Sequence, residues 1–124
     1  MDISKTLKDL DEGEWHDWSG TDVRLKVRNL RPFQMQALRR RHIRRVSDKY
    51  PDGMDVDGLN ESVLNACLIG WEGLTDNGSA YECTEENRIK LFRDVPDFYV
   101  FWIKKITKIL KVRALEWEDD ELGN

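Results

Sequence analysis

The residues best suited to chemistry lie in one short stretch, 38–46, which contains five arginines and one histidine. Guanidinium groups pair well with phosphate and carboxylate groups, so this stretch could bind nucleic acid or an acidic protein surface. If 38–46 is helical, four of the arginines share its outward side: Arg40, Arg41, Arg44 and Arg45. A small nucleic-acid-binding accessory protein that uses this basic helix face is therefore one hypothesis.

The distribution of charge along the chain disfavours a nucleic-acid partner. The net charge is −4, and seven acids within 1–22 precede ten basic residues within 24–49. Residues 116–121, EWEDDE, are acidic again. A dedicated phosphate binder is usually basic as a whole, and no helix-turn-helix, zinc-finger or base-stacking motif accompanies the arginines. The pattern favours charge complementarity within the protein or with an acidic partner protein.

Catalytic, metal and cofactor sites are not indicated. Residues 52–58 resemble the start of an EF-hand calcium loop, but the first ligand position is Gly53 and the final glutamate position is Leu64. The two histidines have no serine or cysteine motif beside them, the two cysteines lack metal-ligand spacing, and no glycine-rich phosphate loop is present. We therefore expect a protein that is not an enzyme and has no metal or cofactor. We also expect no membrane association, because no apolar run approaches the roughly 18 residues that span a bilayer.

Hydrophobic periodicity and turn residues predict the elements that position these groups. Two strands form a hairpin at 14–18 and 23–30, because apolar and basic residues alternate in the second strand. An Asn-Gly turn lies within 75–79, and a threonine caps the helix that follows it. Helices are expected over the ranges 32–50, 56–70, 84–92 and 95–115.

The expected fold class is mainly α. We expect a compact helical domain of about four helices with a small N-terminal β-hairpin. The chain is expected to form a single domain over 1–124. Its acidic ends, 1–13 and 117–124, are expected to be flexible, the first forming a short helix at most.

Two of the predicted helices carry apolar faces. The face of 32–50 comprises Met35, Leu38, Ile43, Val46 and Tyr50, with Arg39 and His42 inside it. An arginine within such a face requires an acidic or carbonyl partner. The face of 95–115 includes Phe98, Phe101, Trp102, Ile106 and Ile109. This second face is wide for a small domain, so it either contacts a partner or another copy, or forms the central core helix.

The segment 64–102 resembles the tail assembly chaperones of long-tailed bacteriophages and prophages. In that family a helix ends in a tryptophan-glycine turn, and an Asp/Asn-Gly hairpin and a Ser/Thr-capped helix beginning Glu-Glu-Asn follow. The corresponding residues are Leu68 to Leu74, Asp76-Asn77-Gly78, Tyr81, Thr84 to Asn87 with Leu91, and Val95-Pro96. The strand pair that includes Trp18 to Val27 is also similar, so the resemblance covers about residues 14–112.

The resemblance implies a non-enzymatic chaperone. It would bind the tape-measure protein, a long and mostly helical chain, keep it soluble and help to recruit tail-tube subunits. Many copies for each tape measure imply a homo-oligomer. The expected place of action is the host bacterial cytoplasm rather than the mature virion. Such families often make a longer product by ribosomal frameshifting, and the codons of Leu122-Gly123-Asn124 could contain a slippery sequence.

Overall fold

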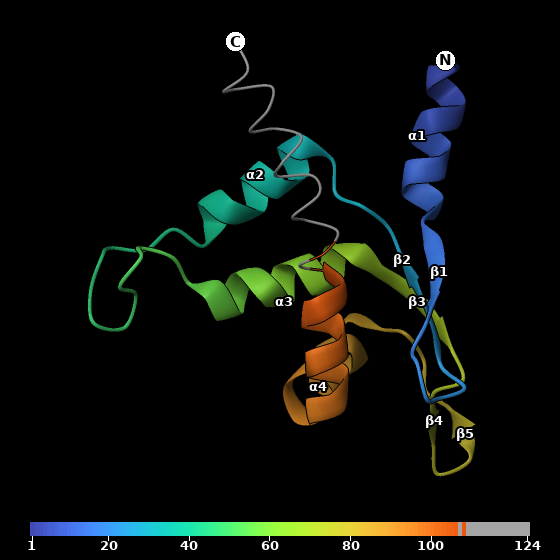
Figure 1. The fold of residues 1–124 in the computed structure, drawn as a ribbon. Coiled ribbons are helices and arrows are strands. Elements are labelled where there is room, and N and C mark those ends of the chain that lie inside the picture. Colours follow the sequence, from blue (N-terminus) through green and yellow to red (C-terminus); the bar gives the residue numbers. More distant parts are fainter. Residues whose placement is uncertain (107, 109–124) are drawn as a thin grey trace. The chain divides into compact units, whose positions relative to one another are not determined.

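The computed structural model describes residues 1–106 and 108 (Figure 1). The elements are, in chain order, α1 (Ile3–Glu12), β1 (Glu14–Asp17), β2 (Arg24–Val27), α2 (Pro32–Arg41), α3 (Val56–Cys67), β3 (Leu68–Glu72), β4 (Thr75–Asp76), β5 (Ser79–Ala80) and α4 (Glu85–Asp94). A further helix occupies 96–106. The chain divides into two compact units, 1–89 and 90–124. None of the helices described is both long and apolar enough to cross a bilayer.

The fold is mixed α/β, which corrects the expectation of a mainly helical domain with one hairpin. The described residues form five helices, a three-stranded antiparallel sheet in the order β1-β2-β3, and a two-stranded sheet of β4 and β5. The element not predicted from the sequence is β3. The predicted helix 56–70 ends at Cys67, and Leu68–Glu72 pairs instead with β2. A short apolar run fits either a helix end or a strand, and here the open edge of β2 decides for the strand.

The predicted N-terminal hairpin is confirmed. Strands β1 and β2 are antiparallel neighbours over their whole length. The alternation in β2 places Leu25 and Val27 in the core and leaves Arg24 exposed. The connecting loop is closed by Thr21, whose hydroxyl donates to the carbonyl oxygen of Trp18 at 2.7 Å.

The core of the first unit is built from β2, α2, α3 and the start of β3. Helix α2 packs against α3, and α3 leads directly into β3. The buried apolar residues of this unit are Val23, Leu25, Val27, Leu30, Met35, Leu38, Val63, Leu64, Cys67 and Leu68. Their burial provides the main driving force for folding of the unit.

The second unit has its own buried aromatic residues. Helix 96–106 begins at Pro96, which suits the first turn of a helix. Phe98, Trp102 and Ile106 lie one turn apart and are buried. The rings of Phe98 and Trp102 are stacked with their centroids 6.3 Å apart, and the Phe92 and Tyr99 rings are 4.9 Å apart.

Helix α2 is shorter than predicted. It ends at Arg41, and 42–55 form a folded loop instead of the continuation to residue 50. Backbone hydrogen bonds close this loop, from the Asp55 N–H to the His42 carbonyl and from the Arg44 N–H to the Gly53 carbonyl, both at 2.8 Å. The backbone groups after Arg41 therefore find partners across the loop rather than along a helix.

The early end of α2 corrects the predicted apolar face. Met35 and Leu38 are buried, but Ile43 is 59% exposed and Val46 is 69% exposed. Arg39 is exposed at the surface, so the predicted need for an acidic or carbonyl partner does not arise. His42 is half-buried just beyond the helix end.

The turn and cap predicted around residues 75–84 are confirmed. Asn77 and Gly78 have φ of 50° and 83° between β4 and β5, as an Asn-Gly hairpin turn requires. The Thr84 hydroxyl accepts a hydrogen bond from the Asn87 N–H at 3.1 Å, which caps α4. Upstream, the Trp71 indole N–H donates to the carbonyl oxygen of Tyr81, and the two rings stack at 5.9 Å.

Replacement of Leu25 by alanine tests the central position of β2. Leu25 is 0% exposed, so Leu25→Ala is expected to lower the free energy of unfolding by about 2–5 kcal/mol through lost burial and an unfilled cavity. Urea denaturation measures this change. Leu7→Ala, the same substitution on the surface of α1, is the matched control and should change stability by no more than about 0.5 kcal/mol. Equal effects at both positions would contradict the core assignment.

Candidate functional site

The structure does not bring the four predicted arginines onto one helix face. Arg40 and Arg41 end α2, whereas Arg44 and Arg45 belong to the loop that follows, and all four are exposed. Arg44 is engaged within the loop, since its Nη1 donates to the carbonyl oxygens of Arg41 and Ile43 at 2.9 Å each. Two of the four arginines therefore belong to α2 and two to the loop, so they do not form the single helix face that the sequence predicts.

A histidine, an aspartate and a serine meet where this loop joins α3. His42 Nε2 lies 2.8 Å from Ser62 Oγ, within hydrogen-bonding distance. His42 Nδ1 lies 3.8 Å from Asp55 Oδ2, which is beyond hydrogen-bonding distance. The other oxygen of Asp55 accepts from the Gly58 N–H at 3.1 Å and caps α3. In a nucleophilic triad the aspartate is hydrogen-bonded to the histidine and orients it, whereas this aspartate serves the helix end.

A pocket opens beside this cluster, between α2, α3 and the first turn of α4. It has a cavity volume of about 320 Å³. We call it the arginine pocket, defined by its lining residues Leu38, Arg41, Ser62, Asn65, Ala66, Glu85 and Arg88. One predicted site residue, Arg41, thus meets a second arginine that is 47 positions away in the sequence.

Arg88 is held in place by residues around the pocket. Its Nε donates to Asn65 Oδ1 at 3.3 Å, and its Nη1 donates to the Cys83 carbonyl oxygen at 3.1 Å. Arg88, Asn65 and Ser62 are not among the site residues predicted from the sequence. Each carries an ordinary polar side chain in a predicted helix, and no local pattern indicates that the helices face one another.

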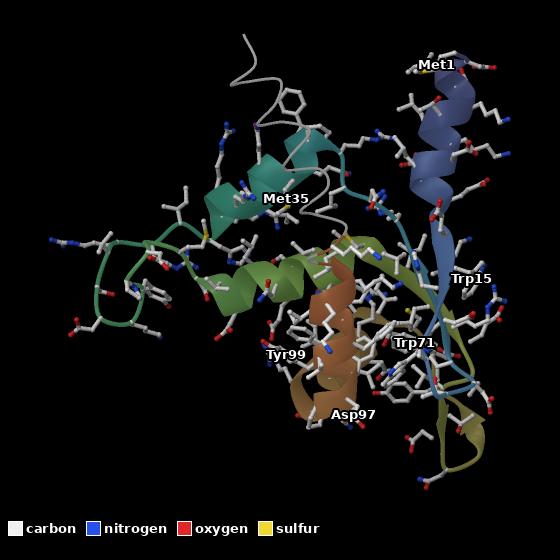
Figure 2. All side chains as sticks on the ribbon, in the orientation of Figure 1. Met1, Trp15, Met35, Trp71, Asp97 and Tyr99 are labelled. Atoms are coloured by element: carbon white, nitrogen blue, oxygen red, sulfur yellow. The ribbon has the colours of Figure 1, made fainter. Side chains whose placement is uncertain are left out.

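Helix α1 presents an uncovered apolar face. We define the α1 face as Ile3, Leu7 and Leu10, spaced by four and three residues so that they lie along one side of the helix. Ile3 is 61% and Leu7 40% exposed, Leu10 is half-buried, and no residue of α1 is buried. In Figure 2, Met1 lies at the far end of this helix from Trp15, the labelled residue of β1.

Both ends of α1 are well defined. The Asp2 carboxylate accepts from the Ser4 N–H at 3.0 Å and caps the first turn. At the other end, Arg31 donates through Nη2 to both carboxylate oxygens of Asp11, at 2.9 and 3.0 Å. Residues 3–12 thus form the short helix that was the alternative to a flexible N-terminus, and none of its residues is buried.

The predicted partner-binding residues of the last helix have a different placement. Phe98, Trp102 and Ile106 are buried, Phe101 is half-buried, and Ile109 lies outside the described residues. This burial agrees with the alternative in which the helix contributes to a core. The exposed large apolar residues of the same helix are Tyr99 and Val100.

Neither cysteine has the environment of a reactive thiol. Burial raises the pKa of Cys67 to about 12, an effect that the positive charge of Arg28 partly offsets. Burial also raises the pKa of Cys83, and the hydrogen bond and charge of Arg88 act in the opposite direction. No group of three or more His, Cys, Asp or Glu side chains among residues 1–106 and 108 is arranged to hold a metal ion.

Comparison of the chain with protein-family models, with curated proteins and with solved structures finds no match.

Replacement of Asp55 separates its capping role from its charge. Asp55→Ala removes the oxygen that accepts from Gly58, so it is expected to lower the free energy of unfolding by about 1 kcal/mol. Asp55→Asn retains a capping oxygen, so it should lower the free energy of unfolding clearly less than Asp55→Ala does. Urea denaturation compares both variants with Asp52→Ala, which removes an exposed carboxylate from the adjacent loop. Asp55 Oδ2 lies 3.8 Å from both His42 Nδ1 and Arg44 Nη2. If Asp55→Asn lowers stability as much as Asp55→Ala, the negative charge beside these two residues matters more than the cap.

Alkylation distinguishes the two cysteines. The thiolate is the reactive form, and a raised pKa reduces its fraction at a given pH. At pH 8, iodoacetamide is therefore expected to label Cys83 slowly and Cys67 more slowly still, because Cys67 is only 1% exposed. Peptide mass spectrometry of timed samples measures both rates. In urea the two rates should become similar, and faster labelling of Cys67 in the folded protein would contradict the described burial.

Proposed function

We propose that the protein is a non-enzymatic tail assembly chaperone of a bacteriophage or prophage, which binds the tape-measure protein, keeps it soluble and helps to recruit tail-tube subunits. The observation that carries the proposal is the exposed α1 face. Its three apolar side chains follow helical spacing, and Ile3 and Leu7 are exposed while Leu10 is half-buried. Such a surface is suited to packing against an amphipathic helix of another protein.

The chemistry of the proposed partner matches this surface. A very long chain of amphipathic helices exposes apolar stripes until other proteins cover them, and uncovered stripes aggregate. A small module with an apolar helix face can cover such a stripe, and many modules can do so along its length. Repeated binding of this kind favours a homo-oligomer, and its place would be the host cytoplasm before the tail is complete.

Within the first unit, the segment that resembles the family has consistent local contacts. Its tryptophan, Trp71, lies in β3 and is bonded to the Tyr81 carbonyl beyond the Asn-Gly turn. Thr84 then caps α4 in the position where the family has a serine or threonine. These contacts give Trp71, Tyr81 and Thr84 structural roles, which supports the part of the resemblance that these residues carry.

The nucleic-acid alternative has less support. Arg44 Nη1 is bonded to the backbone carbonyls of Arg41 and Ile43, and the four arginines are divided between the end of α2 and the loop that follows. The chain also has a net charge of −4. Protein binding is the function that the exposed surfaces favour.

A charge placed within the α1 face tests the proposal. Under this proposal, co-expression with the tape-measure protein of the same phage or prophage is expected to raise the soluble fraction of that protein. Leu7→Glu should weaken the interaction about tenfold or more, because the buried contact of one leucine contributes roughly 1.5–3 kcal/mol. The soluble fraction and co-purification of the two proteins are the measurements.

The matched control for Leu7→Glu is Ser4→Glu. It adds the same charge to α1 outside the apolar face, in the first turn where an acid is tolerated. Ser4→Glu should retain the solubilising effect, and circular dichroism should show both variants folded. The proposal is wrong if the wild-type protein leaves the tape-measure protein insoluble. If Leu7→Glu and Ser4→Glu have equal effects on the soluble fraction, the α1 face does not take part in the interaction.

A further inference from the structure

We propose that the arginine pocket binds a glutamate or aspartate side chain of another protein. The acidic residue would have apolar neighbours in the sequence of that protein. The inference concerns the chemistry of this site and does not depend on which protein supplies the carboxylate. It can therefore be correct or wrong independently of the proposed chaperone function, which is tested with variants of α1.

Arg88 has a guanidinium group that is already oriented. Two of its nitrogens are committed, Nε to Asn65 Oδ1 and Nη1 to the Cys83 carbonyl oxygen. Its remaining nitrogen, Nη2, has no hydrogen bond or ion pair to the described residues. A planar group held in this way loses little conformational entropy when it binds a carboxylate. Arg88 is also half-buried, which strengthens its attraction to an anion relative to an exposed cation.

Two more donors line the same pocket. Arg41 forms no ion pair within 1–106 and 108, although its backbone carbonyl accepts from Arg44. The Asn65 oxygen accepts from Arg88, so the amide NH₂ group of Asn65 is the part of this side chain still able to donate. Charge-assisted hydrogen bonds from two guanidinium groups and an amide are the donor set that recognises a carboxylate.

The charge of the pocket fits a single acidic side chain, and its size leaves room for neighbouring residues of the same partner. Two arginines and one glutamate, Glu85, give its lining a formal charge of +1. Glu85 forms no ion pair with either arginine in the described part of the chain, and its place in the first turn of α4 lets the helix dipole stabilise its charge. The cavity of about 320 Å³ lies at the lower end of the range for ligand sites.

The apolar part of the lining favours a protein ligand over a nucleic-acid phosphate. Leu38 is buried at 6% exposure and Ala66 is half-buried, so the pocket offers apolar contact beside its cations. An acidic residue with leucine neighbours can use both kinds of contact. A duplex phosphate backbone requires an extended row of exposed cations, whereas here the neighbouring Arg44 is bonded within its own loop.

NMR titration of the full chain with a blocked peptide tests the site. The probe is acetyl-Leu-Glu-Leu-Leu-amide, and its counterpart with glutamine in place of glutamate is the ligand control. Saturable shifts are expected at the Arg88 Nε–H and the Asn65 side-chain amide, with a Kd in the millimolar range for so small a ligand. The glutamine peptide should bind about tenfold more weakly, because charge-assisted hydrogen bonds are lost.

Arg41→Gln and Arg39→Gln form the matched pair of variants. Both remove one positive charge from exposed positions of α2, but only Arg41 lines the pocket. Arg41→Gln should weaken binding of the glutamate peptide about tenfold, whereas Arg39→Gln should leave it within about twofold. Arg88→Lys retains the charge but not the planar fork and should also weaken binding.

Four results would overturn the assignment. The first two are the absence of saturable shifts at the pocket and equal binding of the two peptides. The third is an equal loss of affinity for the glutamate peptide in the Arg41 and Arg39 variants. The fourth is tighter binding of inorganic phosphate or duplex DNA than of the glutamate peptide to the same residues. Each can occur while the Leu7→Glu result on the tape-measure protein remains as expected. The converse is also possible, so the two proposals fail separately.

Discussion

Pairing of β2 along both of its edges is the constraint on which the first unit depends. Strand β1 covers one edge and β3 the other, with a register shift between Lys26 and Val27. The next residue, Arg28, donates its backbone N–H to the Cys67 carbonyl at 2.8 Å and its Nε to the Ala66 carbonyl at 2.7 Å. These bonds satisfy carbonyl groups at the last turn of α3, which otherwise lack partners. The end of α3 is therefore determined by the neighbouring strand.

The same region sets the direction of α1 without covering it. Arg28 lies 3.9 Å from the Asp11 carboxylate, and Arg31 binds that carboxylate directly. Gly13 connects α1 to β1 with φ of 72°, and a Cβ there would lie 2.6 Å from the Val27 carbonyl oxygen. Exposed ion pairs contribute little to stability, so they orient the helix rather than hold it in a core. An apolar helix face thus stays at the surface, where a partner can reach it.

The arginine pocket is a consequence of where α2 ends. Because the loop 42–55 closes on itself, Arg41 is the last helical residue and lies beside the face of α3 that carries Ser62 and Asn65. The Asp55 cap fixes the start of α3 and thereby the positions of Ser62 and Asn65 along this helix. The first turn of α4 supplies Arg88. The polar pocket and the apolar α1 face are separate features of one unit, and each is the basis of one of the two proposals.

Local chemistry in the sequence determined much of the backbone. Alternation in 23–30 specified the hairpin, Asn77-Gly78 specified the β4–β5 turn, and Thr84 specified the start of α4, because each signal acts within a few residues. The tertiary structure alone decided the rest. Three features depend on groups that are distant in sequence. They are the pairing of Leu68 with β2 instead of a longer α3, the end of α2 at Arg41, and the placement of Arg88 opposite Arg41. Hydrophobic periodicity indicates which face of an element is buried, but it does not identify the element that packs against that face. Both β3 and the arginine pocket depend on that packing, β3 on its pairing with β2 and the pocket on the meeting of α2, α3 and α4.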